Sequence, residues 1–215
     1  MLRCSKANVL AALLILAMWG ATSSAVADDA ICDGEISEGI LDNVIVPAGE
    51  VCQLRGPNSR GTVEVNGNVI VEPGGALRAD GLVIGGNVES DSAAYIFLGS
   101  SCEVIGNVKI THTIAAPPYS TGLPPLNSVC NCMVGGSLTV ENNVAPFDIG
   151  QAPTCTGGGI SVGGNVKVFG NEAPVRISNN EIGGTLTCDS NTPLATGNPG
   201  SNSVSGNKEG ECSGL

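Results

Sequence analysis

The sequence predicts an all-β protein, a single-stranded parallel β-helix (solenoid) with about 20 residues per coil and about 7 to 9 coils. Three observations predict this fold. A Gly-Asn-Val motif returns along the chain at steps close to twenty residues. Short aliphatic alternations of period two stand between turns rich in glycine and proline. After the N-terminal segment, no stretch keeps an apolar period of 3.6 over ten residues, so helical repeats are excluded.

The N-terminal 27 residues have the pattern of a secretory signal peptide. Arg3 and Lys6 precede an apolar run over 9–19, which is shorter than the roughly 20 residues that span a bilayer. Small residues end in a cleavage pattern just before Asp28. We therefore expect residues 28–215 to form the β-helix domain, secreted to the extracellular space, the periplasm or the cell envelope.

The net charge of the chain limits the classes of partner that it can bind. Residues 28–215 hold seven basic and twenty acidic side chains, a net charge of −13. So acidic a surface repels phosphate backbones and anionic lipids, and we expect neither nucleic acid binding nor membrane insertion. An extracellular glycan or protein partner, and self-association, stay open. The chain has one histidine and no Asp-rich loop, so we expect no metal and no cofactor.

The repeated motif predicts how the coils stack. Its glycine recurs at steps of 19, 20, 30, 28, 20 and 22 residues, at Gly67, Gly86, Gly106, Gly136, Gly164, Gly184 and Gly206. Each step is one coil of a solenoid. The aliphatic residue two positions after the glycine should form an internal column, made of Val69, Val88, Val108, Leu138, Val166 and Leu186. Parallel crossovers favour a right-handed helix.

The asparagines of the motif allow two interpretations. Asn68, Asn87, Asn107 and Asn165 could form a ligand-binding row. The preferred interpretation is a structural ladder, in which the amides stack at the coil spacing of about 4.8 Å and hydrogen-bond along the axis. The glycine before each asparagine is expected to supply the unusual backbone angles of the turn.

Eight cysteines remain after cleavage, and an even number in an exported chain predicts disulfides. Residues one coil apart lie within bridging distance of about 5–6 Å. The predicted pairs are Cys32–Cys52, Cys102–Cys132, Cys130–Cys155 and Cys188–Cys212. An alternative for the middle of the chain joins Cys102 to Cys130.

The two long steps contain insertions near 112–132 and 142–160. Both should leave the coil at the same point and lie side by side, and loops on a rigid scaffold often carry binding. The candidate binding residues are His112, Tyr119, Phe147 and Asp148. The alternative is a pair of disulfide-tied loops without a binding role.

Catalysis is not expected. Acid–base chemistry on a glycan needs two carboxylates a few ångströms apart, and the outward acidic residues are scattered without a recurring Asp pair. The sequence motifs of pectate lyases and polygalacturonases are missing, and the five aromatic residues of 28–215 offer no sugar-stacking platform. Tyr95 and Phe97, two residues apart, should share a face and pack together.

Three segments, ICDGEISEGILDNVIVPAGEVCQL, the repeated GGNV and the ending GNKEGECSGL, resemble a group of small exported bacterial β-helix proteins of unknown function. The resemblance implies fold and export, not an activity. Coil length alone is similar to that of bactofilins, which polymerise end to end, but the signal peptide and the stapled ends depart from them. The predicted function is a secreted structural or adhesive β-solenoid. Alternatives are a carbohydrate-binding or polysaccharide-degrading β-helix and an end-to-end polymer.

Overall fold

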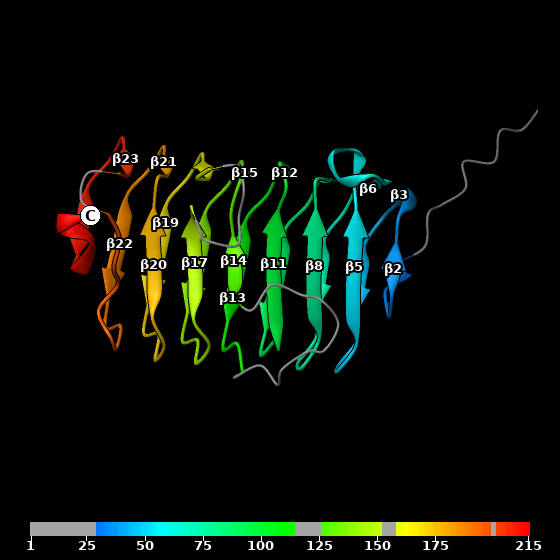
Figure 1. Ribbon diagram of the computed structural model, residues 1–215, viewed down its shortest axis with the longest axis horizontal. Coiled ribbons are helices and arrows are strands. Elements are labelled where there is room, and N and C mark those ends of the chain that lie inside the picture. The colour runs from blue at the N-terminus through cyan, green and yellow to red at the C-terminus, as the bar shows by residue number, and fades with distance from the viewer. Residues whose placement is uncertain (1–28, 115–125, 152–157, 199–200) are drawn as a thin grey trace, which may run out of the picture.

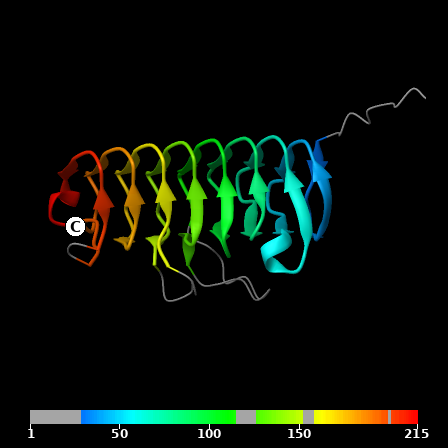
Figure 2. The same cartoon turned by 90° about the horizontal axis from the view of Figure 1, so that it is seen from above.

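The computed structural model describes residues 29–114, 126–151, 158–198 and 201–215. Three parallel sheets, here named A, B and C, run along the molecule with their strands perpendicular to its long axis (Figure 1). The chain passes from A to B to C in each coil and returns to A one coil further on (Figure 2). The predicted parallel β-helix is confirmed.

Each sheet takes one strand from nearly every coil. Sheet A contains β1 (Ala30–Ile31), β4 (Val44–Val46), β7 (Val69–Val71), β10 (Val88–Asp91), β13 (Val108–Thr111), β16 (Leu138–Glu141), β19 (Val166–Phe169), β22 (Leu186–Asp189) and β24 (Lys208–Gly210). Sheet B contains β2 (Glu35–Ile36), β5 (Val51–Arg55), β8 (Ala76–Asp80), β11 (Tyr95–Gly99), β14 (Asn127–Val129), β17 (Phe147–Gly150) and β20 (Val175–Ser178). Sheet C contains β3 (Glu38–Leu41), β6 (Thr62–Val65), β9 (Val83–Ile84), β12 (Cys102–Val104), β15 (Cys132–Val134), β18 (Ser161–Val162), β21 (Glu181–Ile182) and β23 (Ser203–Val204). Two 3₁₀-helices, η1 (Pro57–Ser59) and η2 (Glu211–Gly214), complete the described elements.

The coils stack in the predicted register. Eight strands of sheet C mark eight coils, within the expected range. Val88 pairs with Val69 on one side and Val108 on the other, and the column continues through Leu138, Val166 and Leu186. All six side chains are fully buried. Burial of one such side chain contributes roughly 1.5–3 kcal/mol, and a stack of coils repeats that gain along one core.

The motif asparagines form the predicted ladder. The Oδ1 atoms of Asn68 and Asn87 accept hydrogen bonds at 2.8 Å from the backbone N–H of the asparagine one coil later. Asn107 and Asn165 do the same for Ser137 and Thr185, at 2.9 and 2.8 Å. Each bond therefore fixes one coil on the next at the corner between sheets C and A.

The reason for the motif glycine differs from the expected one. Gly86 and Gly106 do not have a positive φ. Instead, a Cβ atom on Gly86 would lie 2.5 Å from the Asn68 Oδ1 atom of the preceding coil. The glycine is required because the asparagine amide of the previous coil occupies that space. The motif glycine of one coil therefore packs against the motif asparagine of the coil before it.

Two further ladders are fully buried, and the motif did not predict them. At the corner between sheets A and B, the side-chain amides of Asn143 and Asn171 each donate to Oδ1 of the next asparagine at 2.8 Å, ending at Asn191. At the corner between sheets B and C, Asn180 donates to Asn202 at 2.9 Å. These bonds satisfy polar groups in the interior, where an unpaired amide would be costly.

Three predicted disulfides are confirmed. Cys32–Cys52, Cys102–Cys132 and Cys188–Cys212 each join neighbouring coils, with Cα–Cα distances of 5.3, 4.6 and 5.2 Å. The alternative of Cys102 with Cys130 is wrong, because Cys102 bonds to Cys132. Cys155 lies outside the described residues, so its pairing with Cys130 stays a prediction.

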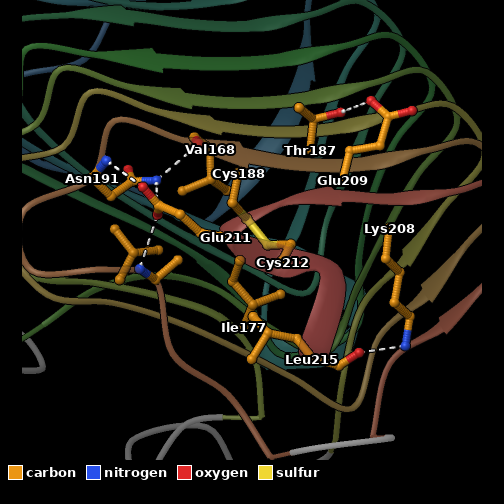
Figure 3. Close-up of a disulfide and its surroundings, with 12 residues drawn as sticks. Val168, Ile177, Thr187, Cys188, Asn191, Lys208, Glu209, Glu211, Cys212 and Leu215 are labelled. Atoms are coloured by element: carbon orange, nitrogen blue, oxygen red, sulfur yellow. Dashed lines mark hydrogen bonds between the residues drawn. A yellow bond between two sulfur atoms is a disulfide. The ribbon is translucent and has the colours of Figure 1, made fainter.

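The last coil is closed by η2. Cys212 is buried and bonded to Cys188, and Leu215 packs against the core (Figure 3). The Glu211 carboxylate accepts hydrogen bonds from the backbone N–H of Asn191 at 2.9 Å, from its side-chain amide at 2.8 Å, and from Ala195 N–H at 3.2 Å. This short helix therefore covers the core and terminates the buried asparagine ladder.

The expected boundaries of the insertions are wrong. Residues 142–160 include β17, a regular strand of sheet B that pairs with β14 and β20. The first insertion falls between β13 and β14, which is the turn from sheet A to B, whereas the second falls between β17 and β18, the turn from B to C. The two therefore leave the coil at different corners, because Phe147–Gly150 continues the sheet B register.

Substitution of the motif glycine should destabilise the fold. Gly86→Ala forces a methyl group against the Asn68 amide, and we expect a loss of about 1–3 kcal/mol in the free energy of unfolding, measured by chemical denaturation. Gly34→Ala is the matched control, since nothing lies within 4 Å of a Cβ at that position. Equal losses for the two variants would contradict the interlocked-coil explanation.

The cap at Glu211 should make stability depend on pH. Burial raises the pKa of Glu211, but hydrogen bonds from Asn191 and Ala195 outweigh it and hold the pKa below its ordinary value of 4.5. Because the folded pKa is the lower one, the stabilisation is complete above the unfolded pKa and is lost as pH falls through the folded pKa. Glu211→Gln, which places an amide against N–H donors, should cost about 1 kcal/mol at pH 7.

Denaturation of Glu211→Gln and of the unchanged protein between pH 7 and pH 3 checks this. The difference in the free energy of unfolding should narrow as the pH falls below about 4.5. A Glu209→Gln variant, on the exposed neighbouring strand, is the control and should follow the unchanged protein. A pH-independent difference for Glu211→Gln would refute the cap.

Candidate functional site

The structure does not bring the four predicted binding residues together. His112 follows β13 on the exposed edge of sheet A, where its Nδ1 atom lies 2.8 Å from Oδ1 of Asp91. The hydrogen bond from His112 lowers the pKa of that carboxyl. Phe147 points into the core and is 1% exposed, so its assignment to a binding patch is wrong. The alternation of side chains along β17 turns it inward.

Asp148 points to the other side of β17, onto the outer face of sheet B. It is buried there and lies 3.2 Å from Nη2 of Arg176. Burial raises the pKa of Asp148, and Arg176 opposes that rise. Tyr119 lies outside the described residues. Asp148 and His112 therefore belong to different faces of the solenoid and form no common patch.

The outer face of sheet B holds a buried cluster of side chains in its middle coils. Tyr95 and Phe97 form a second apolar cluster with Ala76 and Cys130, as expected of two aromatic residues on one face. The guanidinium of Arg78 lies 5.3 Å from the centre of the Phe97 ring and pairs with Asp80. Burial raises the pKa of Tyr95 far above its ordinary value. Tyr95 and Phe97 are therefore buried, whereas the Arg78 side chain is 25% exposed.

The outer face of sheet C has a different composition. One residue per coil points outward at the same register position, and the strand register places these residues in a single row along the axis. From the second coil on, this residue stands three positions before the motif glycine. This acid–apolar column consists of Ile40, Glu64, Val83, Glu103, Met133, Ser161, Glu181 and Ser203. Over its first five members, apolar and acidic side chains alternate. Val83 and Met133 in this column are 41% and 54% exposed.

A cleft of about 580 Å³ opens beside this column, at the corner between sheets B and C. Its walls include Glu103, Met133 and Glu181 from the column, with Asn131 and Asn179 at the corner. Between the two asparagines the sixth coil contributes Gly159, where a Cβ would overlap the carbonyl oxygen of Asn179. Gly159 therefore contributes no side chain to this part of the cleft wall.

A strip of glycines borders the column on its other side. The first glycine of each Gly-Gly pair, one position before the motif glycine, is exposed at Gly85, Gly135, Gly163 and Gly183. A Cβ at Gly135 would lie 2.5 Å from the carbonyl oxygen of Ile105 in the preceding coil. Close stacking of the coils leaves no side chain at these four glycines, and Ile105, which is 52% exposed, interrupts the strip between Gly85 and Gly135.

The charges on the three faces are distributed unequally. On sheet A, Lys167 pairs with Glu141 at 2.6 Å. On sheet B, Arg55 pairs with Glu35 at 3.0 Å, in addition to the pairs of Arg78 and Arg176. Within the described residues, no strand of sheet C holds a lysine or arginine, and the carboxylates of Glu64, Glu103 and Glu181 have no ion pair or hydrogen bond.

Neither a cluster of metal ligands nor a comparison with known proteins assigns a function to this face. The described part of the chain has no group of three or more His, Cys, Asp or Glu side chains that could hold a metal ion. Over the same residues, no helix has the length and apolar character needed to cross a membrane. Comparisons with protein-family models, with curated proteins and with solved structures find no match to this chain.

Proposed function

We propose that the protein is an exported, non-catalytic β-solenoid with a structural or adhesive role at the cell exterior. The observation that carries the proposal is the set of three disulfides, each of which joins one coil to the next. Such bonds persist in oxidising compartments and are rare in the cytosol. The signal-peptide pattern of residues 1–27 supports the same localisation.

A rigid, disulfide-linked solenoid suits binding of a partner better than catalytic turnover of a substrate. Each coil is fixed on its neighbours by backbone bonds, amide ladders and a shared core, so surface groups keep fixed spacings over many coils. Repeat proteins use such extended surfaces to bind partners along their length. Binding of a partner that contacts several coils costs little conformational entropy of the solenoid, because the scaffold is already ordered.

The closed end argues for a solenoid of limited length rather than a filament. A second copy that added strands in register to the last coil would have to displace η2, whose Cys212 is buried and disulfide-bonded. Leu215 covers the core at the same place, and its carbonyl oxygen accepts a hydrogen bond from the Lys208 ammonium. This end therefore works as a cap.

Export is tested by expression of the full chain in a bacterial host. We expect cleavage before Asp28, recovery outside the cytoplasm, and oxidised cysteines by mass spectrometry under non-reducing conditions. A control with arginine at Leu14 and Ile15 interrupts the apolar run and should keep the chain in the cytoplasm. An uncleaved cytoplasmic chain with free thiols would overturn the proposal.

Removal of the cap should induce self-association. We expect residues 28–210 carrying Cys188→Ser to sediment as concentration-dependent oligomers, because the open sheet edges and the core of the last coil become exposed. The control is residues 28–215 carrying Cys188→Ser and Cys212→Ser, which retains η2 and should remain largely monomeric. Filaments formed by the uncapped and the full-length proteins alike would contradict the cap.

A further inference from the structure

The outer face of sheet C has the properties of a docking surface. It presents a cleft of about 580 Å³, a row of exposed apolar side chains and, in the acid–apolar column, three carboxylates that have no ion pair within the described residues. On the other two faces the chain pairs several carboxylates, among them Glu35, Asp91 and Glu141, with arginine, histidine or lysine. The described strands of sheet C hold no lysine or arginine, so a cationic partner would supply the positive charge that this face lacks.

We propose that sheet C binds a cationic amphipathic α-helix of another protein, aligned with the solenoid axis. The proposal rests on the non-catalytic interaction role argued above and names the face and the chemistry of the partner. Lysine or arginine side chains of the helix pair with Glu64, Glu103 and Glu181. Apolar side chains of the same helix face contact Val83 and Met133.

The spacing of the column selects a helix over an extended strand. Neighbouring coils are about 4.8 Å apart. Side chains on one face of an α-helix, three or four residues apart, are separated by about 4.5–6 Å along its axis, whereas side chains on one face of a strand repeat at about 6.6–6.8 Å. A helix with basic residues at i and i+7 and an apolar residue between them therefore follows the order Glu64, Val83, Glu103.

The local structure supports close approach of such a helix. Gly85, Gly135, Gly163 and Gly183 have no side chains that would hold a partner away from the column. In the coil of Glu103 the same position is Ile105, whose side chain is 52% exposed and adds apolar surface to this face. The cleft between Asn131 and Asn179 receives a basic side chain that reaches Glu181, with the amides as further hydrogen-bond acceptors. The Cys102–Cys132 disulfide joins two coils at the edge of this cleft, so its walls are fixed before binding.

The length of the column sets the length of the helix. Glu64 and Glu181 are five coil steps apart, about 24 Å, which corresponds to roughly 16 residues of α-helix. The probe is a synthetic, fluorescein-labelled 21-residue peptide with lysine at one heptad position, leucine three residues later and alanine or glutamine elsewhere. A scrambled peptide of the same composition, which loses the single face, is the first control.

Fluorescence anisotropy with the purified protein comprising residues 28–215 measures the affinity at 0.15 M salt. Glu103→Gln/Glu181→Gln should weaken binding of the probe about tenfold, since exposed ion pairs contribute about 0.2–1 kcal/mol each and the cleft adds hydrogen bonds. Met133→Ser should weaken it about threefold through lost apolar contact. Glu89→Gln/Glu172→Gln, the same charge change on exposed residues outside sheet C, is the matched control and should alter affinity less than twofold.

Selective weakening by the sheet C variants, together with weaker binding of the scrambled peptide, supports the docking surface. Equal weakening by the control pair would overturn it, because binding would then follow net charge alone. Absence of binding at tens of micromolar would also overturn it. The assay uses purified protein and export is measured in cells, so failure of one proposal is distinguishable from failure of the other.

Discussion

The structure depends on one coil-to-coil contact, in which a side-chain amide of one coil occupies the space beside a glycine of the next. Asn68 accepts a hydrogen bond from the backbone of Asn87, and Gly86 leaves room for it. A shift of register by one residue would place a Cβ against the amide and would also turn inward side chains outward. The contact therefore fixes the core and the outward rows together.

An interaction that repeats along an axis must end somewhere, and two of the ladders each end at a carboxylate: the motif ladder at the first coil and the buried ladder between sheets A and B at the last. At the first coil, the Asn43 amide donates to Oδ1 of Asp29 at 2.8 Å. At the last coil, the Glu211 carboxylate receives the N–H groups of Asn191. Within the buried ladder, each side-chain amide donates to the amide oxygen of the asparagine in the next coil. The last amide, of Asn191, donates to the Glu211 carboxylate instead. The cysteine next to Glu211 then fixes this acceptor in place.

The periodicity of the sequence predicted the fold, the aliphatic column, the exposed ladder and three disulfides, because each follows from one residue per coil at a fixed place. The prediction failed where spacing varied. Asn143 and Asn171 each begin an Asn-x-Ala-Pro segment that Asn191 does not repeat, and the burial of all three depends on tertiary structure. The 142–160 insertion was misplaced because the strand Phe147–Gly150 has no glycine before its last residue. Within a long step between two motif glycines, such a segment resembles a loop. The spacing also places one residue three positions before each motif glycine, so a row at the sheet C position could be predicted. The sequence does not show whether that row points into the core or outward, and the exposure in the structure decides it.

The unpaired acidic row on sheet C is compatible with a stable fold because of its spacing. Glu64 and Glu103 are two coil steps apart, about 9–10 Å, and this exceeds the Debye length of about 8 Å at physiological salt. Val83 lies between them and adds no charge. Solvent ions thus screen the repulsion along the row without an internal counter-charge. A basic side chain that arrives from outside contacts each carboxylate at short range, where screening is weak, so the row stays available to a cationic partner at little cost to the solenoid.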